Sequence, residues 1–134
     1  MKILITGGCG FVGRHIAERC IKEDCHLTIA DDLSAGTKIG KWKLAYLEDF
    51  RTWCKVNPCD YDLIFHCAAV VGGRLKIEGD PLAVATDLAI DADFFNWCAK
   101  GKPGKIVYFS SSAVYPVVMQ QRNFHIDLLE DYVD

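Results

Sequence analysis

The chain has 134 residues, of which 51% are hydrophobic, enough for one domain with a packed core but not for two. Its formal net charge of −3 argues against a nucleic-acid-binding domain, because such domains are usually strongly basic. No apolar stretch approaches the roughly 20 residues of a membrane-spanning helix, and the apolar run near the N-terminus is too short for a signal peptide. We therefore expect a single cytoplasmic domain with neither a membrane nor a nucleic acid as partner.

In chain order, the first elements alternate between short apolar runs and amphipathic stretches. Lys2–Thr6 is a β-branched-rich run that predicts a strand buried on both faces. Phe11–Lys22 places apolar residues at helical spacing and predicts a helix. His26–Ala30 and Lys43–Leu47 predict a second and a third strand. The segment 33–43 between them is too short and too rich in glycine for a substantial helix.

The second half of the chain continues the alternation. Asp62–Ala68 predicts a fourth strand and Lys105–Ser110 a fifth. Between them Pro81–Lys100 predicts a long helix with Asp80 as its N-cap. This pattern indicates βαβ units in an α/β fold, a doubly wound (Rossmann) parallel sheet with strand order 3-2-1-4-5. We expect it to span residues 1–116, with a polar tail over 117–134.

Seven cysteines form an odd set without a Cys-x-x-Cys pair. Without a secretion signal, a disulfide framework is not expected. The pairs Cys20/Cys25 and Cys54/Cys59 leave a zinc site as a minor alternative, although structural zinc sites usually have tighter spacing. The favoured interpretation is that the cysteines act as small, buried, reduced hydrophobic residues, with no metal bound.

A glycine-rich turn joins the first strand to the first helix. Residues 6–13 read Thr-Gly-Gly-Cys-Gly-Phe-Val-Gly, which contains both G-x-G-x-x-G and G-x-x-G-x-x-G. A tight turn, close approach to a pyrophosphate and close helix packing all exclude side chains, and the helix N-terminus favours negative charge. The turn therefore predicts a dinucleotide site. The expected contacts are Gly7, Gly10, Phe11, Val12 and Gly13.

An acidic residue ends the second strand at the spacing that this motif requires. Asp31 follows Gly13 by 18 residues (31 − 13), and an acidic residue about 20 positions on can bind the ribose hydroxyls. Its carboxylate would repel a 2′-phosphate, and no Lys or Arg follows before Lys38, so NAD is favoured over NADP. A solvated turn at Asp31–Asp32 is the structural alternative.

These motifs resemble the extended short-chain dehydrogenase/reductases, the NAD-dependent epimerases and dehydratases that act on nucleotide sugars. The match runs over nearly the whole chain. Residues 31–36, Asp-Asp-Leu-Ser-Ala-Gly, resemble the ribose-binding turn of the family, and residues 48–51 its adenine-binding Gly-Asp-(aliphatic)-Arg segment, with departures at positions 48 and 50. The resemblance adds five cofactor contacts, which are Asp32, Leu33, Ser34, Asp49 and Phe50.

Two later segments also resemble the family. His66-Cys67-Ala68-Ala69 is similar to a stretch that lines the cofactor, and residues 110–116, Ser-Ser-Ser-Ala-Val-Tyr-Pro, to one that carries a substrate-bonding serine. His66 itself is interpreted as a packed core residue. The resemblance implies further contacts: Cys67, Ala68, Ala69 and Ser110 with the cofactor, Ser111 (or Ser112) in catalysis, and Gly73 and Arg74 with a substrate diphosphate. A solvated loop is an equal alternative for Gly73 and Arg74.

Members of the family use a Tyr-x-x-x-Lys pair, in which the lysine lowers the tyrosine pKa from roughly 10. No tyrosine of this chain has a lysine four positions later. We therefore expect the N-terminal, NAD-binding part of a longer nucleotide-sugar enzyme, which binds NAD(H) without turnover. The alternative is a non-catalytic NAD-binding sensor or interaction module. The fifth strand would form an unprotected sheet edge, which favours self-association into a homo-oligomer.

Overall fold

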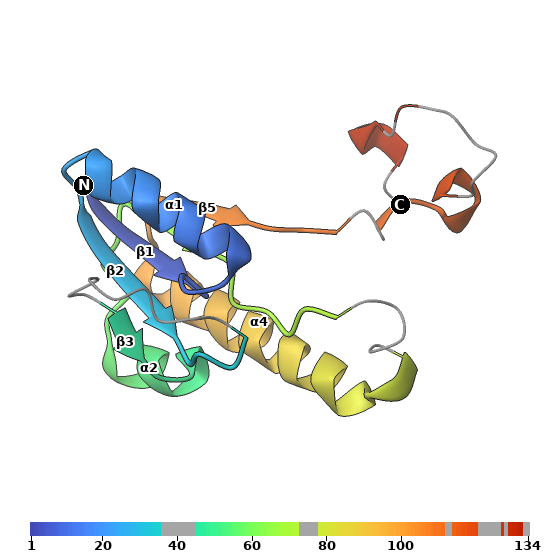
Figure 1. The fold of residues 1–134 in the computed structure, drawn as a ribbon, viewed down its shortest axis with the longest axis horizontal. Helices are drawn as coiled ribbons and strands as arrows, with labels where there is room; N and C mark the ends of the chain where they lie inside the picture. Colours follow the sequence, from blue (N-terminus) through green and yellow to red (C-terminus); the bar gives the residue numbers. More distant parts are fainter. Residues whose placement is uncertain (36–44, 73–77, 112–113, 121–126, 128, 133–134) are drawn as a thin grey trace.

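Five short parallel strands form one sheet in the order β3-β2-β1-β4-β5 (Figure 1). The computed structural model describes residues 1–35, 45–72, 78–111, 114–120, 127 and 129–132. The predicted doubly wound strand order 3-2-1-4-5 is therefore confirmed. The strands are β1 (Lys2–Thr6), β2 (His26–Asp31), β3 (Ala45–Leu47), β4 (Leu63–His66) and β5 (Lys105–Tyr108).

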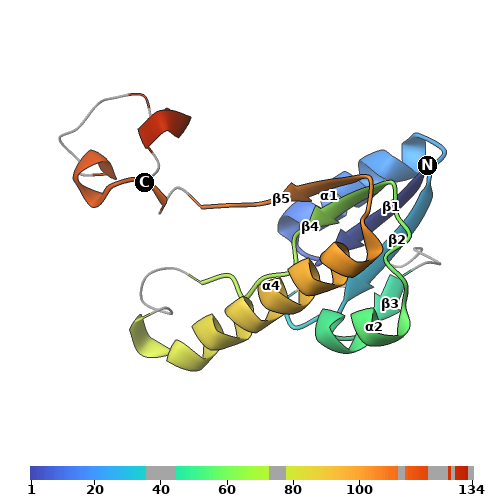
Figure 2. The same cartoon turned by 180° about the vertical axis from the view of Figure 1, so that it is seen from behind.

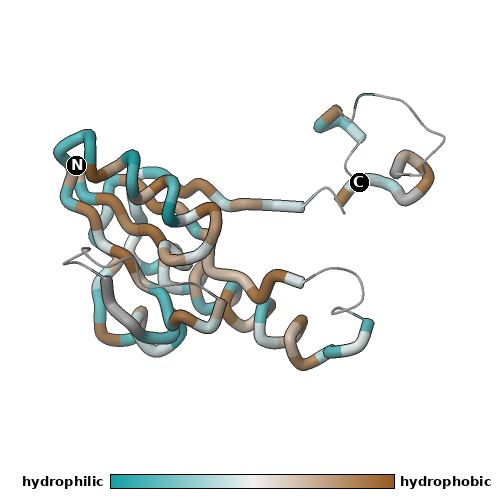
Figure 3. Tube along the Cα trace, in the orientation of Figure 1, coloured by the Kyte–Doolittle hydropathy of each residue, from teal (hydrophilic) through white to brown (hydrophobic). Residues whose placement is uncertain are grey.

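Helices cover both faces of the sheet, which explains why the strands are continuously apolar. α1 (Phe11–Lys22) lies on one face, and α2 (Phe50–Val56) and α4 (Pro81–Gly101) lie on the other (Figure 2). Hydrophobic residues follow β1 through the middle of the sheet (Figure 3). Successive side chains of β1 alternate between the two faces, so Ile3 and Ile5 pack on the α1 side and Leu4 on the other.

The larger core lies between the sheet and the pair α2 and α4. Its aromatic rings pack edge-on or tilted, with centroids 5.7 Å apart for Trp53 and Trp97 and 5.8 Å apart for Phe50 and Phe94. Trp97 also donates its indole N–H to the Asn57 carbonyl at 2.8 Å, which satisfies its polar atom. The buried members of this core are Leu4, Ala30, Phe50, Trp53, Cys54, Cys59, Ile64, Phe94, Trp97 and Cys98.

The strand ends differ from the sequence-based boundaries. β4 ends at His66 and β5 at Tyr108, each two residues earlier than predicted, because β1 ends opposite His66, and β4 and β5 end together. Only 45–47 of the predicted third strand lie among the described residues. The seven-residue helix α2 was not predicted. The cap Asp80 is confirmed, because its Oδ1 accepts from the Ala83 N–H at 3.2 Å.

Beyond β5 the chain leaves the sheet and reaches two short 3₁₀ helices, Val117–Gln120 and Glu130–Tyr132 (Figures 1 and 2). The division into residues 1–116 and 117–134 stays a prediction. Among the described residues, no helix combines the length and apolar character needed to cross a membrane.

All seven cysteines are free thiols. Five are buried, and Cys25 and Cys67 are half-buried. Burial raises the pKa of the Cys98 thiol to about 12, with a further contribution from the neighbouring Cys59. In the part of the chain that the structure describes, no three His, Cys, Asp or Glu side chains gather where they could hold a metal ion. The cysteines pack as small hydrophobic residues.

Candidate dinucleotide-binding site

The glycine turn after β1 is packed too closely for side chains. Gly7 has a φ of +64° and donates its N–H to the Ala30 carbonyl at 2.8 Å. A Cβ atom on Gly7 would lie 2.6 Å from the Ala68 nitrogen. A Cβ atom on Gly13 would lie 2.7 Å from the Gly8 Cα and would collide with the Gly7 carbonyl oxygen. The turn is thus a backbone cradle that only glycine permits.

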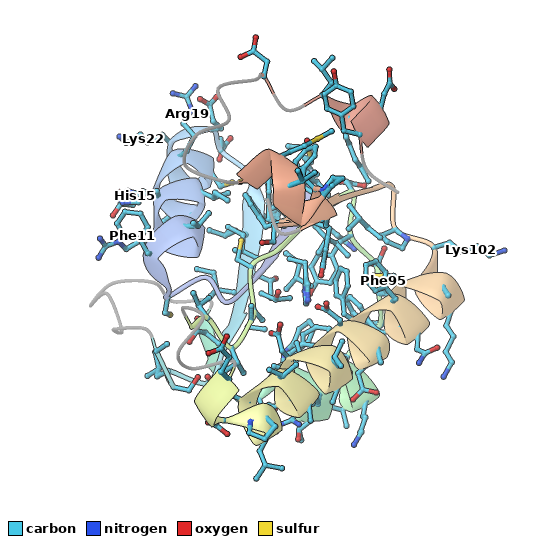
Figure 4. The ribbon with its side chains drawn as sticks, turned by 90° about the vertical axis from the view of Figure 1, so that its right-hand side faces the viewer. Phe11, His15, Arg19, Lys22, Phe95 and Lys102 are labelled. Atoms are coloured by element: carbon cyan, nitrogen blue, oxygen red, sulfur yellow. The ribbon has the colours of Figure 1, made fainter. Side chains whose placement is uncertain are left out.

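The N-terminus of α1 opens onto this cradle. Its N-cap is Gly10, and no side chain in the described part of the chain caps it. The first turn carries no acidic residue, so the N–H groups of residues 11–13 and the positive end of the helix dipole are available to an anion. Phe11 is 75% exposed and carries the Arg14 guanidinium 5.3 Å above its ring. Figure 4 shows Phe11 at the outer side of α1.

Asp31 ties the cradle to the turn that follows β2. Its side chain is buried, and its Oδ2 accepts from the Cys9 N–H at 2.8 Å. Its Oδ1 accepts from the Leu33 N–H, also at 2.8 Å. Next to it, the Asp32 Oδ1 accepts from the Ser34 N–H at 2.9 Å. One carboxylate therefore brings the glycine turn and the turn 31–34 together, and its remaining lone pairs can accept hydroxyl protons.

Asp49 and Phe50, the expected adenine contacts, also organise α2. Asp49 is the N-cap and accepts from the Arg51 N–H at 2.8 Å, and its Oδ2 pairs with the Arg51 Nη2 at 2.5 Å. This hydrogen-bonded guanidinium lowers the pKa of the Asp49 carboxyl. The Phe50 ring is buried in the aromatic core, so this side chain is not exposed to a ligand.

Cys67 and Ala68 lie against the cradle from the end of β4. The Cys67 N–H donates to the Thr6 carbonyl at 3.0 Å, and the Ala68 N–H donates to the Thr6 hydroxyl oxygen at 3.2 Å. Burial raises the pKa of the Cys67 thiol to about 11, which favours the protonated thiol at neutral pH. This segment forms a wall beside the glycine turn.

His66 is buried, which confirms its interpretation as a core residue. Its Nδ1 lies 2.8 Å from the Thr6 Oγ1, and its Nε2 lies 3.2 Å from the Asp91 Oδ1. Its ring stacks on Phe94 with centroids 3.7 Å apart. The Tyr108 hydroxyl donates to the Asp91 Oδ2 at 2.6 Å, and this bond raises the Tyr108 pKa to about 12.

Two carboxylates of α4 lie beside the site and were not among the predicted residues. Asp91 joins His66 and Tyr108, and Asp87, one turn earlier, accepts from the Val70 N–H at 2.8 Å. Their only signal in the sequence is the spacing i and i+4, which places these two of the three acidic residues of α4 on one face of the helix. Of the remaining predicted residues, Ser110 and Ser111 are exposed after β5, whereas Ser112, Gly73 and Arg74 lie outside the described residues.

The buried His66 predicts a pH dependence of folding. Burial lowers its pKa from 6.5 against the opposing effect of Asp91 and Asp87, and Tyr108 is the other titratable group at this junction. The unfolded chain binds the proton more readily than the folded chain. The contribution of His66 to the free energy of unfolding is therefore fully present well above pH 6.5. It is lost as the pH drops toward the folded pKa, by up to about 1.4 kcal/mol per pH unit. Urea unfolding between pH 7.5 and 5.5 should show this slope, and His66→Gln should flatten it. Equal slopes would contradict the assignment.

Taken together, a parallel sheet, a glycine cradle at the first strand–helix turn and an acidic residue at the end of β2 define a dinucleotide-binding α/β domain. Comparison with known proteins also assigns the chain to a family. The sequence model of the NAD dependent epimerase/dehydratase family matches residues 3–131. The chain belongs to this family, as the motifs predicted, and NAD is its cofactor.

Individual relatives agree with this assignment. The UDP-N-acetyl-alpha-D-glucosaminuronate decarboxylase of Bacillus cytotoxicus is 28% identical over 127 residues, which cover 85% of this chain and 37% of that protein. An uncharacterized UDP-glucose epimerase of Bacillus subtilis is 35% identical over 131 residues, covering 86% and 41%. The chain thus spans about two fifths of the length of these curated relatives.

Solved structures share the fold. An epimerase of Methanothermobacter thermautotrophicus superposes with a TM-score of 0.77 at 19% identity, covering 98% of this chain and 40% of that one. The Thermus thermophilus UDP-glucose 4-epimerase, solved as a complex with NAD, has a TM-score of 0.62 at 23% identity, covering 79% and 36%. These likenesses confirm the Rossmann-type architecture.

Proposed function

We propose that this chain is the NAD(H)-binding part of a nucleotide-sugar epimerase or dehydratase. The observation that carries the proposal is the buried carboxylate of Asp31, which accepts the Cys9 N–H from the glycine turn and the Leu33 N–H from the next turn. The turn fits the strand–turn–helix motif that binds a dinucleotide, since a Cβ atom at Gly7 or Gly13 would collide with neighbouring backbone and displace the turn at the helix N-terminus.

In this proposal each group of residues has one task. The N–H groups at the start of α1 donate hydrogen bonds to the pyrophosphate, and Asp31 accepts hydrogen bonds from the adenosine ribose hydroxyls. Asp49 and the main chain of Phe50 meet adenine, while Ser110 and residues 67–69 line the cofactor. When bound, NAD supplies reversible hydride transfer at a sugar carbon. The hydroxyl of Ser111, or of Ser112, bonds the sugar oxygen, and Gly73 and Arg74 meet the substrate diphosphate.

These 134 residues contain no Tyr-x-x-x-Lys pair, so this chain by itself should bind NAD(H) without turning over a sugar. The same observation favours a second candidate, a non-catalytic NAD-binding module. Both candidates need the cofactor site. A coding sequence that continues into Tyr-x-x-x-Lys would favour the enzyme, and a stop codon after Asp134 would favour the module.

The test is a titration of NADH followed by its fluorescence. Wild type should bind, and Asp31→Ala should bind roughly 10- to 100-fold more weakly, because hydrogen bonds to a charged group are lost. Asp31→Ala should also narrow the preference for NADH over NADPH, because the carboxylate that repels a 2′-phosphate is gone.

A matched control is Asp60→Ala. Asp60 is exposed and pairs with the Lys2 ammonium at the amino end of β1, the opposite end of that strand from the glycine turn, so this variant should bind like wild type. Equal and negligible signals from wild type and Asp31→Ala would refute the proposal.

A further inference from the structure

Four polar side chains from four elements meet beside the proposed cofactor site. Thr6 ends β1, His66 ends β4, Asp91 lies on α4 and Tyr108 ends β5. Consecutive members lie 2.8 Å, 3.2 Å and 2.6 Å apart between their hydrogen-bonding atoms. Thr6 and His66 are buried, so each of their polar atoms needs a partner within the protein.

The donor and acceptor in each of these hydrogen bonds follow from the groups at the two ends of the series, the Ala68 N–H and the Asp91 carboxylate. The Ala68 N–H can only donate, so it occupies one lone pair of the Thr6 oxygen. At the other end an ionised Asp91 can only accept, and it does so from Tyr108 and from the His66 Nε2. Burial lowers the pKa of His66 and so favours its neutral form, whose Nε2 donates to Asp91 and whose Nδ1 accepts the hydroxyl proton of Thr6. All donors and acceptors in this chain of bonds are matched.

At the Thr6 end, these hydrogen bonds fix the position of residues 67 and 68, which form the wall beside the glycine turn. The Ala68 nitrogen lies 2.6 Å from where a Cβ of Gly7 would stand, so the Ala68 peptide touches the glycine turn. Two bonds attach this wall to Thr6. One is a main-chain bond from the Cys67 N–H, and the other ends on the Thr6 hydroxyl. The second bond needs the hydroxyl oxygen in the orientation that His66 sets.

We propose that His66 and Asp91 are positioning residues for NAD, which act by orienting the Thr6 hydroxyl so that it holds the Ala68 peptide against the glycine turn. The inference rests on the proposed function, because it is the NAD path along residues 67–69 that gives the wall its role. Tyr108 anchors the same carboxylate to β5, two residues before Ser110. These hydrogen bonds thus join the glycine turn to the segment of Ser110, which is proposed to line the cofactor.

The test compares Thr6→Val, which removes the hydroxyl at nearly constant shape, with Thr6→Ser, which keeps it. Amide hydrogen exchange without cofactor should accelerate at Ala68 in Thr6→Val, while Cys67 stays protected by its bond to the Thr6 carbonyl. NADH should bind roughly 10-fold more weakly to Thr6→Val and within about 2-fold of wild type to Thr6→Ser. Asp91→Asn should shift the ¹⁵N resonances of His66 and accelerate exchange at Ala68.

The outcomes separate the inference from the proposed function. Unchanged Ala68 exchange in Thr6→Val would overturn the inference, as would faster exchange with wild-type NADH affinity. A wild-type protein that does not bind NADH would overturn the proposed function and with it the positioning role, whatever the exchange at Ala68. Weaker binding restored by Thr6→Ser, with Cys67 protected throughout, supports the inference, because a general loss of packing would affect both amides.

Discussion

Gly13→Ala should weaken NADH binding at least about 10-fold and lower the free energy of unfolding by about 1–3 kcal/mol. On helix propensity alone, alanine should instead stabilise a helical position by about 1 kcal/mol. The added methyl group, however, would meet the Gly7 carbonyl oxygen and the Gly8 Cα, both of them backbone atoms that cannot rotate away. The glycine turn must therefore shift, and the cradle for the pyrophosphate shifts with it.

Gly79→Ala is the matched control, because a Cβ there would have no atom within 4 Å. It should leave NADH affinity unchanged and should not lower stability. Urea unfolding and NADH fluorescence on both variants give the comparison. Wild-type NADH affinity in Gly13→Ala would contradict the assignment of the glycine turn as the pyrophosphate site.

The elements that could be predicted from the sequence are those determined by residues close together in the chain. The strand Lys2–Thr6, the glycine turn and the helix Phe11–Lys22 follow from β-branched runs, absent side chains and helical spacing within a few residues. The acidic residue at the end of β2 could also be placed, because a fixed motif spacing relates Asp31 to the glycine turn.

What could not be predicted depends on contacts between distant residues. α2 has only seven residues, too few for a periodic pattern, and depends on the Asp49 cap and on the burial of Trp53 and Phe50. Asp91 reads as one more acidic residue of a helix until the fold brings it to His66, 25 positions earlier, and to Tyr108, 17 positions later. No sequence spacing encodes such a meeting.

The aromatic core under the site yields the largest expected effect on stability. Phe94→Ala should lower the free energy of unfolding by about 3–5 kcal/mol, the usual range for a fully buried phenylalanine. The Phe94 ring is fully buried, lies 5.8 Å from Phe50 and stacks on His66 at 3.7 Å. Its removal leaves a cavity between α4 and the sheet and takes the support from one face of the imidazole.

Phe95→Ala is the control, because it makes the same substitution at the next residue without opening a buried cavity. Phe95 is 46% exposed on the same helix, so Phe95→Ala should cost less than half as much in urea unfolding. Because the cavity in Phe94→Ala frees His66, NADH affinity should fall in this variant more than in Phe95→Ala, measured where both proteins are folded. Equal losses of stability in the two variants would mean that the core does not centre on Phe94. Equal NADH affinities would mean that the stacked imidazole does not transmit core packing to the cofactor site.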